Sequence, residues 1–336
     1  MDSVETDVLI VGAGIAGSAL ACALRESGLR ALLIDKSDQP LDTARGDHLQ
    51  PYTCELLQRW GVLGDFFDAG AEMRSGAIWY TNDGECLLRS SVAELDIPHP
   101  YFAFINHEKI ADVLLSASLA YNNVEVIRPI RNWWLESDDS DHYTVKVGLP
   151  DGVDQRVRTK IIVGADGRGS RLRNTLAFDS ASHRYERGIV VLFAMPEDDD
   201  PEHFLRVYLG PASTTSVIPR TGGGCKIGIP VTQKEFADWR RASQIDLKAR
   251  LREQVPVLQV SSIRFGDIYS PVYLHTEQWV KGAAVLIGDA CHAMHPARSQ
   301  GMNISIRCID VLAGLLGNVG STVPRKDAAR LLSEYE

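Results

Sequence analysis

Apolar runs and amphipathic stretches alternate along the first part of the chain. Residues 8–24 are almost wholly uncharged, and three glycines separate a strand-like beginning from a helix-like continuation. We predict that Gly28 ends this helix, because glycine favours helix C-termini, and that the apolar run at residues 30–35 forms the next strand. Continuous apolar strands on either side of a helix are typical of a parallel sheet that is buried on both faces.

Two later apolar runs lead directly into an aspartate. The run at residues 161–163 precedes Asp166, and the run at residues 283–287 precedes Asp289. Because ligands of parallel α/β sheets bind beyond the carboxyl ends of the strands, both aspartates are candidate ligand-binding residues. The apolar periodicity after Gly301 predicts a further helix that begins near this glycine.

The middle of the chain has the pattern of shorter, antiparallel strands. We predict a hairpin with its turn at residues 82–84, and two or three strands over residues 206–231 with a turn at residues 222–224. Helix-like stretches follow at residues 233–243 and 245–254. The whole pattern predicts an α/β fold, in which a Rossmann-like dinucleotide-binding domain is joined to a smaller domain built on a mostly antiparallel β-sheet.

Composition narrows the classes of function. The 336 residues suffice for two domains, and the net charge of −9 argues against nucleic-acid binding and against attraction to an anionic membrane. The first apolar run imitates a targeting signal, but Asp2, Glu5 and Asp7 precede it where a signal peptide carries Lys or Arg. We therefore expect no export signal and no membrane span. The six scattered cysteines show no disulfide spacing, which favours reduced thiols and a cytoplasmic protein.

The stretch GDACHAMHPARSQGMN, at residues 288–303, concentrates side chains that could bind a metal. These are Asp289, Cys291, His292 and His295. Zinc sites usually combine two short Cys or His spacings, however, and the chain has no C-x-x-C motif. A Cys-His nucleophile is disfavoured as well, because residues adjacent in sequence rarely have the geometry that a thiolate and its base require. We expect no metal here.

The glycines of the first apolar run fit a dinucleotide-binding loop. Gly12, Gly14 and Gly17 stand in G-x-G-x-x-G register between the predicted strand and helix. The first glycine permits a tight turn, the second lets the backbone approach a pyrophosphate, and the third allows the helix to pack closely on the strand. Asp35, at the end of the next strand, is placed as a ribose-binding acid. An acid favours the free 2′-hydroxyl of FAD or NAD over the 2′-phosphate of NADP.

Together, these features resemble the FAD-dependent (class A) flavoprotein monooxygenases of the para-hydroxybenzoate hydroxylase type. The resemblance covers nearly the whole chain and rests on the glycine loop, Asp166-Gly167, Gly288-Asp289, Pro296 and Gly301-Met302-Asn303. It implies non-covalently bound FAD, NADPH or NADH as a transient electron donor, and O₂. It also implies hydroxylation of a small aromatic molecule through a flavin C4a-hydroperoxide, without a side-chain nucleophile.

The resemblance assigns residues and domains. In the family, the G-D aspartate bonds the ribityl chain of FAD, and the loop and helix after it lie against the flavin ring. Arg45 corresponds to an arginine near the flavin, and His107 stands where relatives usually carry Arg or Gln facing the FAD. The implied cofactor-binding residues are Gly12, Gly14, Ile15, Ala16, Gly17, Asp35, Lys36, Arg45, His107, Asp166, Asp289, Pro296, Gly301, Met302 and Asn303.

The same resemblance implies an FAD-binding domain at residues 1–72, 105–181 and 277–336. The substrate-binding domain is placed at residues 73–104 and 182–276. In the family, the sheet of this second domain covers the flavin and lines the substrate pocket.

The chain also departs from the family. Ser299 replaces the usual glycine before Gln-Gly, which suggests a backbone conformation, or a close approach to the flavin, that favours glycine. Cys308 replaces a common aspartate, and the printed chain ends where relatives continue through further helices. Two alternatives stay open: a flavin reductase or halogenase on the same fold, and a catalytically impaired FAD-binding module. The W-x-W-x-I-P signature of tryptophan halogenases is absent.

Other conspicuous side chains have simpler explanations. Adjacent strand residues face opposite sides, so at most one of Trp133 and Trp134 points into the core. We expect His292 to make structural hydrogen bonds. Arg171 and Arg173, together with Arg168, are candidates for contact with phosphate or the nicotinamide cofactor, and a surface position fits them about as well.

Overall fold

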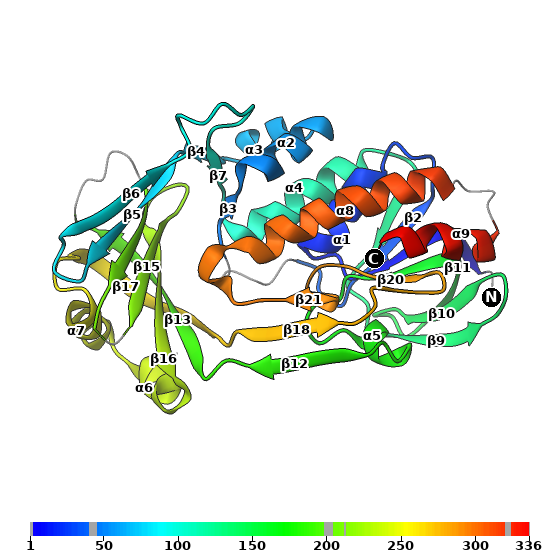
Figure 1. Cartoon of the computed structure of the whole chain (residues 1–336). Coiled ribbons are helices and arrows are strands. Elements are labelled where there is room, and N and C mark those ends of the chain that lie inside the picture. Colours follow the sequence, from blue (N-terminus) through cyan, green and yellow to red (C-terminus); the bar gives the residue numbers. More distant parts are fainter. Residues whose placement is uncertain (1–2, 40–45, 198–203, 212, 320–323, 336) are drawn as a thin grey trace. The chain divides into compact units, whose positions relative to one another are not determined.

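The computed structural model describes residues 3–39, 46–197, 204–211, 213–319 and 324–335 (Figure 1). The chain divides into two compact units, each assembled from separated segments. The first unit comprises Met1–Leu41, Glu108–His183 and Tyr273–Glu336, and the second comprises Asp42–His107 and Arg184–Val272. The predicted fold class, a Rossmann-like α/β part joined to a part built on an antiparallel sheet, is confirmed.

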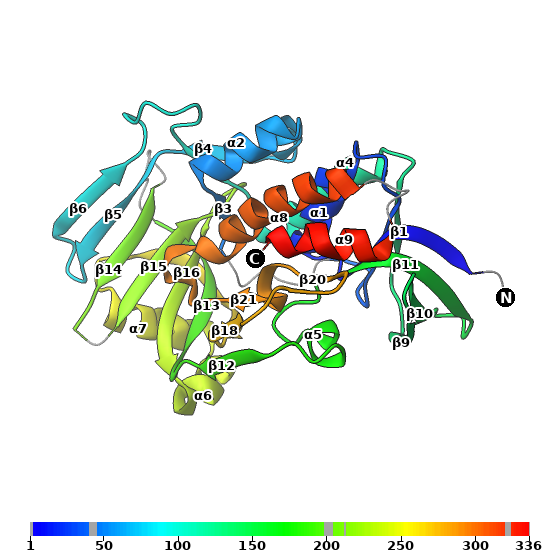
Figure 2. The same cartoon turned by 45° about the vertical axis from the view of Figure 1, so that its right-hand side comes forward.

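A mixed sheet organises the first unit. Its strands run in the order β19-β20-β11-β1-β2-β8, and β10 and β9 continue from β11 as an antiparallel branch, seen beside β11 in Figure 2. The strands are β1 (Val4–Val11), β2 (Ala31–Ile34), β8 (Val124–Ile127), β9 (Asn132–Asp138), β10 (Tyr143–Gly148), β11 (Asp154–Gly164), β19 (Val280–Lys281) and β20 (Ala284–Leu286). Most of a small sheet, β12 (Ser180–Arg184), β18 (Val272–Thr276) and β21 (His292–Ala293), belongs to the same unit.

The carboxyl ends of four parallel strands lie in one row. Ile34, Val11, Gly164 and Leu286 are register partners across β2, β1, β11 and β20. The row continues beyond the strands, since the Ala165 N–H donates to the Val11 carbonyl at 2.8 Å. The segments that follow these strands therefore meet along one edge of the sheet, which is where ligands of such sheets bind.

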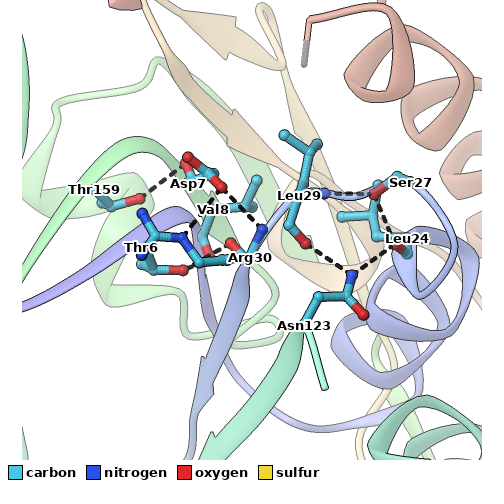
Figure 3. Close-up of polar contacts among 9 residues, drawn as sticks. All are labelled: Thr6, Asp7, Val8, Leu24, Ser27, Leu29, Arg30, Asn123 and Thr159. Atoms are coloured by element: carbon cyan, nitrogen blue, oxygen red, sulfur yellow. Dashed lines mark hydrogen bonds and ion pairs between the residues drawn. The ribbon is translucent and has the colours of Figure 1, made fainter. Parts of the chain in front are cut away.

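Polar side chains fix the register at the opposite, amino-terminal end of the sheet (Figure 3). The Asp7 carboxylate accepts the Arg30 N–H at 2.9 Å, and the Thr6 hydroxyl donates to the Arg30 carbonyl at 2.7 Å. The Thr159 hydroxyl donates to the Asp7 carbonyl at 3.1 Å, which joins β11 to β1. Because a one-residue slip would break these bonds, they favour the pairing that aligns the far ends of the strands.

The helices of the first unit include α1 (Ile15–Leu24), α4 (His107–Leu119), α5 (Arg171–Thr175), α8 (Gln300–Val319) and α9 (Arg325–Leu332). The prediction that α1 extends to Gly28 is wrong. The Ser27 hydroxyl donates to the Leu24 carbonyl at 2.6 Å and ends the helix earlier. Gly28, with φ +75°, instead turns the chain into β2, and the Asn123 amide secures this turn by donating to the Leu29 carbonyl at 2.8 Å (Figure 3).

Among the described residues, α8 is the one helix whose length and apolar composition would suffice to cross a membrane. A core helix of a globular protein meets the same criteria. Helix α8 lies against α1 (Figure 1), and seven of its residues are buried: Asn303, Ser305, Ile306, Ile309, Leu312, Leu316 and Val319. Its apolar face is thus accounted for by packing within the first unit.

The second unit is built on a sheet with the strand order β17-β13-β16-β15-β14-β5-β6. Its strands are β5 (Gly76–Thr81), β6 (Cys86–Ser91), β13 (Arg187–Pro196), β14 (Leu205–Leu209), β15 (Thr214–Pro219), β16 (Cys225–Thr232) and β17 (Val260–Tyr269). Neighbours are antiparallel except for β14 and β5, which run in parallel. Helices α6 (Phe236–Arg241) and α7 (Gln244–Gln254) bury Trp239, Leu247 and Leu251 in the same apolar cluster as one face of the sheet.

The predicted turns of this unit are confirmed. Strands β5 and β6 form the expected hairpin, in which Gly84 has φ +96°. Strands β15 and β16 are joined through Gly222, Gly223 and Gly224, which all have positive φ. The helix-like stretches after β16 are the short 3₁₀ helix η1 (Gln233–Glu235) with α6, and then α7.

The remaining elements of the second unit place residues 48–72 within it. They are β3 (His48–Leu49), β4 (Glu72–Arg74) and β7 (Phe102–Phe104), which pair as β3-β7-β4, with α2 (Pro51–Arg59) and α3 (Leu63–Asp68) between β3 and β4 in the chain. The predicted FAD-binding domain, in contrast, includes all of residues 1–72. The functional domain boundaries stay a prediction, and the pairing of β3 and β4 with β7 is the reason that the compact units differ from them.

Candidate cofactor-binding site

The glycine loop turns at the end of β1, where backbone atoms leave no room for a side chain. Gly12 has φ +110°, and a Cβ atom on it would lie 2.4 Å from the Ala165 carbonyl oxygen. A Cβ atom on Gly17 would lie 1.9 Å from the Gly12 carbonyl oxygen. The two glycines thus permit the turn and the contact with the segment after β11, as their spacing predicted.

Gly14 has a different part in the same loop. It is the N-cap residue of α1, has extended backbone, and supplies no side chain to cap the helix. Open space surrounds the position of its absent Cβ atom. The first-turn N–H groups of Ile15, Ala16 and Gly17 have no intrahelical partners, and they carry the positive end of the helix dipole. Such a helix N-terminus, approached by bare backbone, is suited to a phosphate group.

Asp35 supports the glycine loop from the end of β2. Its carboxylate accepts the Ala13 N–H at 2.6 Å and the Ser37 N–H at 2.8 Å. The side chain is half-buried, whereas the neighbouring Lys36 is exposed. The carboxylate therefore stands beside the loop, at the distance along the chain that the sequence predicted for a ribose-binding acid.

Asp166 lies after β11 at the start of the next helix. One carboxylate oxygen, Oδ2, accepts the N–H groups of Arg171 and Leu172 at 2.7 Å and 3.2 Å. The other oxygen, Oδ1, is buried and has no hydrogen-bond partner among the described residues. A buried carboxylate oxygen without a donor is costly, so the position fits a bound group that supplies one.

Arg173 joins the D-G segment to the G-D segment. Its guanidinium donates to the Ala290 carbonyl at 2.8 Å and to the Arg168 carbonyl at 2.9 Å. Burial lowers the pKa of Arg173, and the Asp166 carboxylate acts in the opposite direction. The surface position considered for Arg173 is wrong, because its side chain is buried and connects two backbone segments.

Arg171 has a structural contact as well. Its guanidinium donates to the Asn132 side chain and lies 5.1 Å from the centre of the Trp133 ring. Trp133 is 2% exposed and Trp134 is 40% exposed, so the prediction that only one of them points inward is confirmed.

The G-D motif contacts the first turn of α1. Gly288 has φ +57°, and a Cβ atom on it would lie 2.8 Å from the Ala16 Cβ atom. Asp289 follows in the short 3₁₀ helix η2 (Gly288–Ala290) and is half-buried. Three contacts thus join the three motifs: Gly12 on Ala165, Ala16 on Gly288, and Arg173 on Ala290.

The loop after the G-D motif turns sharply before α8. It passes through the 3₁₀ helix η3 (Pro296–Arg298) to Ser299, which has φ +50° and ψ +33°. The prediction that this position requires a conformation favourable to glycine is therefore confirmed. The Asn303 amide donates to the Ser299 carbonyl at 2.9 Å and holds the turn at the start of the helix.

The histidines and the cysteine of this stretch are packed rather than poised as nucleophiles. Neither ring nitrogen of His292 has a hydrogen-bond partner among the described residues, so the expected structural hydrogen bonds are wrong; the ring packs against Trp279 with centroids 5.1 Å apart. Burial lowers the pKa of His292 and of His295. Burial also raises the pKa of the Cys291 thiol well above its usual range. In the described part of the chain, no three metal-ligating side chains come together.

Of the four remaining predicted residues, Gly301 and Met302 stand in the first turn of α8. His107 lies in the second unit, and Arg45 lies outside the described residues. The His107 ring places Nδ1 2.9 Å from the Gly46 carbonyl, and its backbone N–H donates to Asp47 at 3.1 Å. Asp47 also forms a buried ion pair with Lys226, at 2.7 Å. This pair was not predicted from the sequence, where its one signal is a lysine in a mostly apolar strand.

The similarity to known proteins agrees with the dinucleotide-binding geometry of the site. Residues 5–326 match the family model described as "FAD binding domain". The chain belongs to this family. The resemblance to FAD-dependent monooxygenases is thereby confirmed, and so is FAD as the cofactor, which the open N-terminus of α1 and the buried Asp166 oxygen both fit.

Two curated relatives are named as a monooxygenase and a hydroxylase. The chain is 27% identical over 98% of its length to 12-dehydrotetracycline 5-monooxygenase/anhydrotetracycline 6-monooxygenase of Streptomyces rimosus, and spans 65% of that protein. It is also 27% identical, over 98% of its length, to ubiquinone hydroxylase UbiL of Rhodospirillum rubrum, of which it spans 76%.

A solved structure with the same fold is that of p-nitrophenol 4-monooxygenase PnpA from Pseudomonas putida. Its TM-score is 0.85 at 20% identity, and the similarity covers 100% of this chain and 84% of that protein. At this identity, the likeness supports the fold.

Proposed function

We propose that the protein is an FAD-dependent monooxygenase that hydroxylates a small aromatic molecule with NADPH or NADH and O₂. The observation that carries this proposal is the meeting of the three motifs at the carboxyl ends of β1, β11 and β20, in a chain whose relatives oxygenate aromatic and quinone compounds. We also propose that the protein is cytoplasmic.

The site residues divide between the two ends of the cofactor. We assign the pyrophosphate to Gly14 and the N-terminus of α1, and the adenosine ribose to Asp35. Asp166 and Asp289 are assigned to the flavin end. The loop from Pro296 to Asn303 would form the bed of the flavin ring, with the N-terminus of α8 favouring negative charge there.

The chain's own groups bind and orient rather than attack. Bound FAD, reduced by the nicotinamide cofactor, supplies the oxygen chemistry. Near it, the raised pKa of Cys291 keeps the thiol protonated, and the lowered pKa values of His292 and His295 keep both rings neutral at pH 7. The site therefore offers no thiolate to compete with the aromatic substrate for activated oxygen.

The test begins with the purified protein, which should be yellow and should release FAD on heating or in acid. A panel of phenols, anilines and aromatic acids is then screened for accelerated NAD(P)H oxidation, and the products are analysed after reaction under ¹⁸O₂. We expect one labelled oxygen atom in the aromatic product. Recovery of NAD alone, or NAD(P)H oxidation that never yields a labelled product from any compound, would contradict the proposal.

A further inference from the structure

His292 is a buried titratable residue that has no part in the proposed oxygen chemistry. It lies on β21 and is 7% exposed, and neither of its ring nitrogens has a hydrogen-bond partner among the described residues. The ring is held by packing instead, because it lies against the Trp279 indole with the two ring centroids 5.1 Å apart. A protonated imidazole has two N–H donors and a charge, so burial in this place costs far more for the protonated ring than for the neutral one.

The backbone that carries this ring is fixed to β18, which runs beside β21 in Figure 1. His275 of β18 is the register partner of His292. The Cys291 carbonyl, one residue earlier, accepts both the N–H group and the hydroxyl of Thr276, at 2.9 Å and 3.1 Å. The Cys291 N–H donates to the Gly288 carbonyl at 3.1 Å and closes η2. Because the backbone is held in this way, side chains must respond to a charge on the ring.

Two titratable groups act directly on the His292 ring, Asp289 on η2 and His275 on β18. A third, Tyr335 of η4 (Ser333–Tyr335), also packs on Trp279, with ring centroids 5.8 Å apart. Burial, the largest cause, and His275 lower the pKa of His292, whereas Asp289 acts in the opposite direction. Among these groups, the partner of opposite charge for a protonated ring is therefore Asp289, the carboxylate that we assign to the ribityl chain of FAD.

We propose that His292 is a positioning residue, which leaves Asp289 to FAD while its ring is neutral and withdraws the carboxylate when the ring takes up a proton. The protonated ring and the cofactor then compete for one carboxylate, so FAD binds more weakly as the pH falls. By the same linkage, bound FAD makes the ring harder to protonate. The inference rests on the proposed function, which assigns Asp289 to FAD, but it requires no turnover.

The test measures FAD affinity by fluorescence titration of the FAD-free protein from about pH 7.5 to about pH 5.5, without NAD(P)H or substrate. We expect the dissociation constant of the parent to rise at least about threefold, since one coupled proton changes affinity by at most about tenfold per pH unit. His292→Gln and His292→Phe cannot take up this proton and should show no such rise. Near-ultraviolet circular dichroism at each pH confirms that each protein is folded. In the parent, NMR of ¹⁵N-labelled histidine should show that FAD lowers the pH at which His292 is protonated.

Two further variants test the route through the carboxylate. Asp289→Asn keeps the shape of the side chain and removes its charge, so FAD should bind more weakly and with no dependence on pH. His275→Gln removes a group that opposes protonation of His292, so the loss of FAD affinity should begin at a higher pH than in the parent. His183→Gln is the matched control. His183 is an exposed ring on the neighbouring strand β12, stacked on Tyr273, and its replacement should leave the pH dependence unchanged.

Constant FAD affinity in the parent would overturn the proposal, as would a pH dependence that persists in His292→Gln or in Asp289→Asn. A pH dependence that His295→Gln removes, and His292→Gln does not, would overturn it as well. These outcomes are separable from failure of the proposed function. A parent with constant affinity, and an Asp289→Asn variant that binds FAD weakly, would remove this inference and leave the assignment of Asp289. The expected pH dependence without any oxygenated product from the aromatic panel would do the reverse, removing the monooxygenase proposal alone.

Discussion

Ser299 occupies the left-handed backbone region, with φ +50° and ψ +33°, at the turn into α8. An L-residue with a side chain is strained there by about 1–2 kcal/mol, whereas glycine is not. The Asn303 amide holds the Ser299 carbonyl and so keeps the turn in place despite this strain. The serine therefore costs stability at a loop that we assign to the flavin ring.

Ser299→Gly should relieve this strain. We expect the free energy of unfolding to rise by about 1 kcal/mol, FAD to bind more tightly, and less of the NAD(P)H consumed to appear as hydrogen peroxide. Urea unfolding, FAD titration and peroxide assays measure these three quantities. Ala177→Gly is the control, because Ala177 has φ +51° in an exposed turn. It should gain similar stability with no change in FAD affinity, and a Ser299→Gly variant with neither gain would show that the serine is harmless.

Asp35→Ala and Asp289→Ala should each weaken FAD binding at least about tenfold. Each removes a charge-assisted hydrogen bond of roughly 1.5–3 kcal/mol to the cofactor, at the adenosine end for Asp35 and at the ribityl end for Asp289. Fluorescence titration of the FAD-free protein gives the dissociation constants. Asp38→Ala, at an exposed position of the same loop as Asp35, should bind FAD normally. Unchanged affinity in both site variants would mean that the cofactor lies elsewhere.

Single residues differ in how far sequence alone predicts them. Gly12, Gly17 and Ser299 were predictable, because a local spacing or a departure from it implies a particular backbone. The ion pair of Asp47 with Lys226 was not, since the two residues are 179 positions apart and neither has a distinctive neighbour in sequence. Contacts of this kind follow from the tertiary fold.

Among the elements, α1 depends most on a single absent side chain. Gly17→Ala would put a Cβ atom 1.9 Å from the Gly12 carbonyl oxygen, so α1 must move away from the glycine loop. We expect a loss of stability of about 1–3 kcal/mol and at least a tenfold loss of FAD affinity, measured by urea unfolding and FAD titration.

The matched control is Gly314→Ala in α8. This glycine is exposed, and nothing lies within 4 Å of its absent Cβ atom. Alanine there should stabilise the helix by about 0.5–1 kcal/mol and leave FAD affinity unchanged. If both alanine variants behaved alike, the close packing of α1 on the loop would be refuted.

Element boundaries show where local rules compete. The hairpin at Gly84 and the helix start at Gln300 follow directly from glycine positions and apolar periodicity. The end of α1 does not, because the Ser27 hydroxyl takes the Leu24 carbonyl before the chain reaches Gly28. The glycine rule predicted the end at Gly28, whereas the side-chain geometry gives the earlier end.

At the scale of the whole molecule, the free energy of unfolding should decrease as the pH is lowered, because of His48. Its ring is buried in the second unit, stacked on Phe104 with centroids 5.0 Å apart, and burial lowers its pKa from 6.5 to about 4. The unfolded chain therefore takes up the proton first as the pH falls. The contribution of the neutral His48 ring to stability is fully present above pH 6.5 and is lost progressively down to about pH 4.

The loss assignable to His48 is of the order of 3 kcal/mol, and urea unfolding at several pH values across this window measures it. Replacement of the ring in His48→Gln should flatten the pH dependence. His183→Gln, at an exposed ring stacked on Tyr273, should leave it as steep as in the parent protein. A parent protein equally stable at both ends of the window would contradict the assignment.

The position of β20 has a consequence for biosynthesis. This strand, Ala284–Leu286, pairs with the edge of β11, although the ribosome makes β11 much earlier. Until β20 emerges, the nascent sheet exposes an unpaired strand edge and lacks the segment that carries Asp289. Such an edge attracts chaperones or other unfinished chains. Ribosomes stalled before residue 284 should therefore display chains that bind chaperones and take up no FAD. Flavin loading should begin only after β20 and Asp289 have been synthesised.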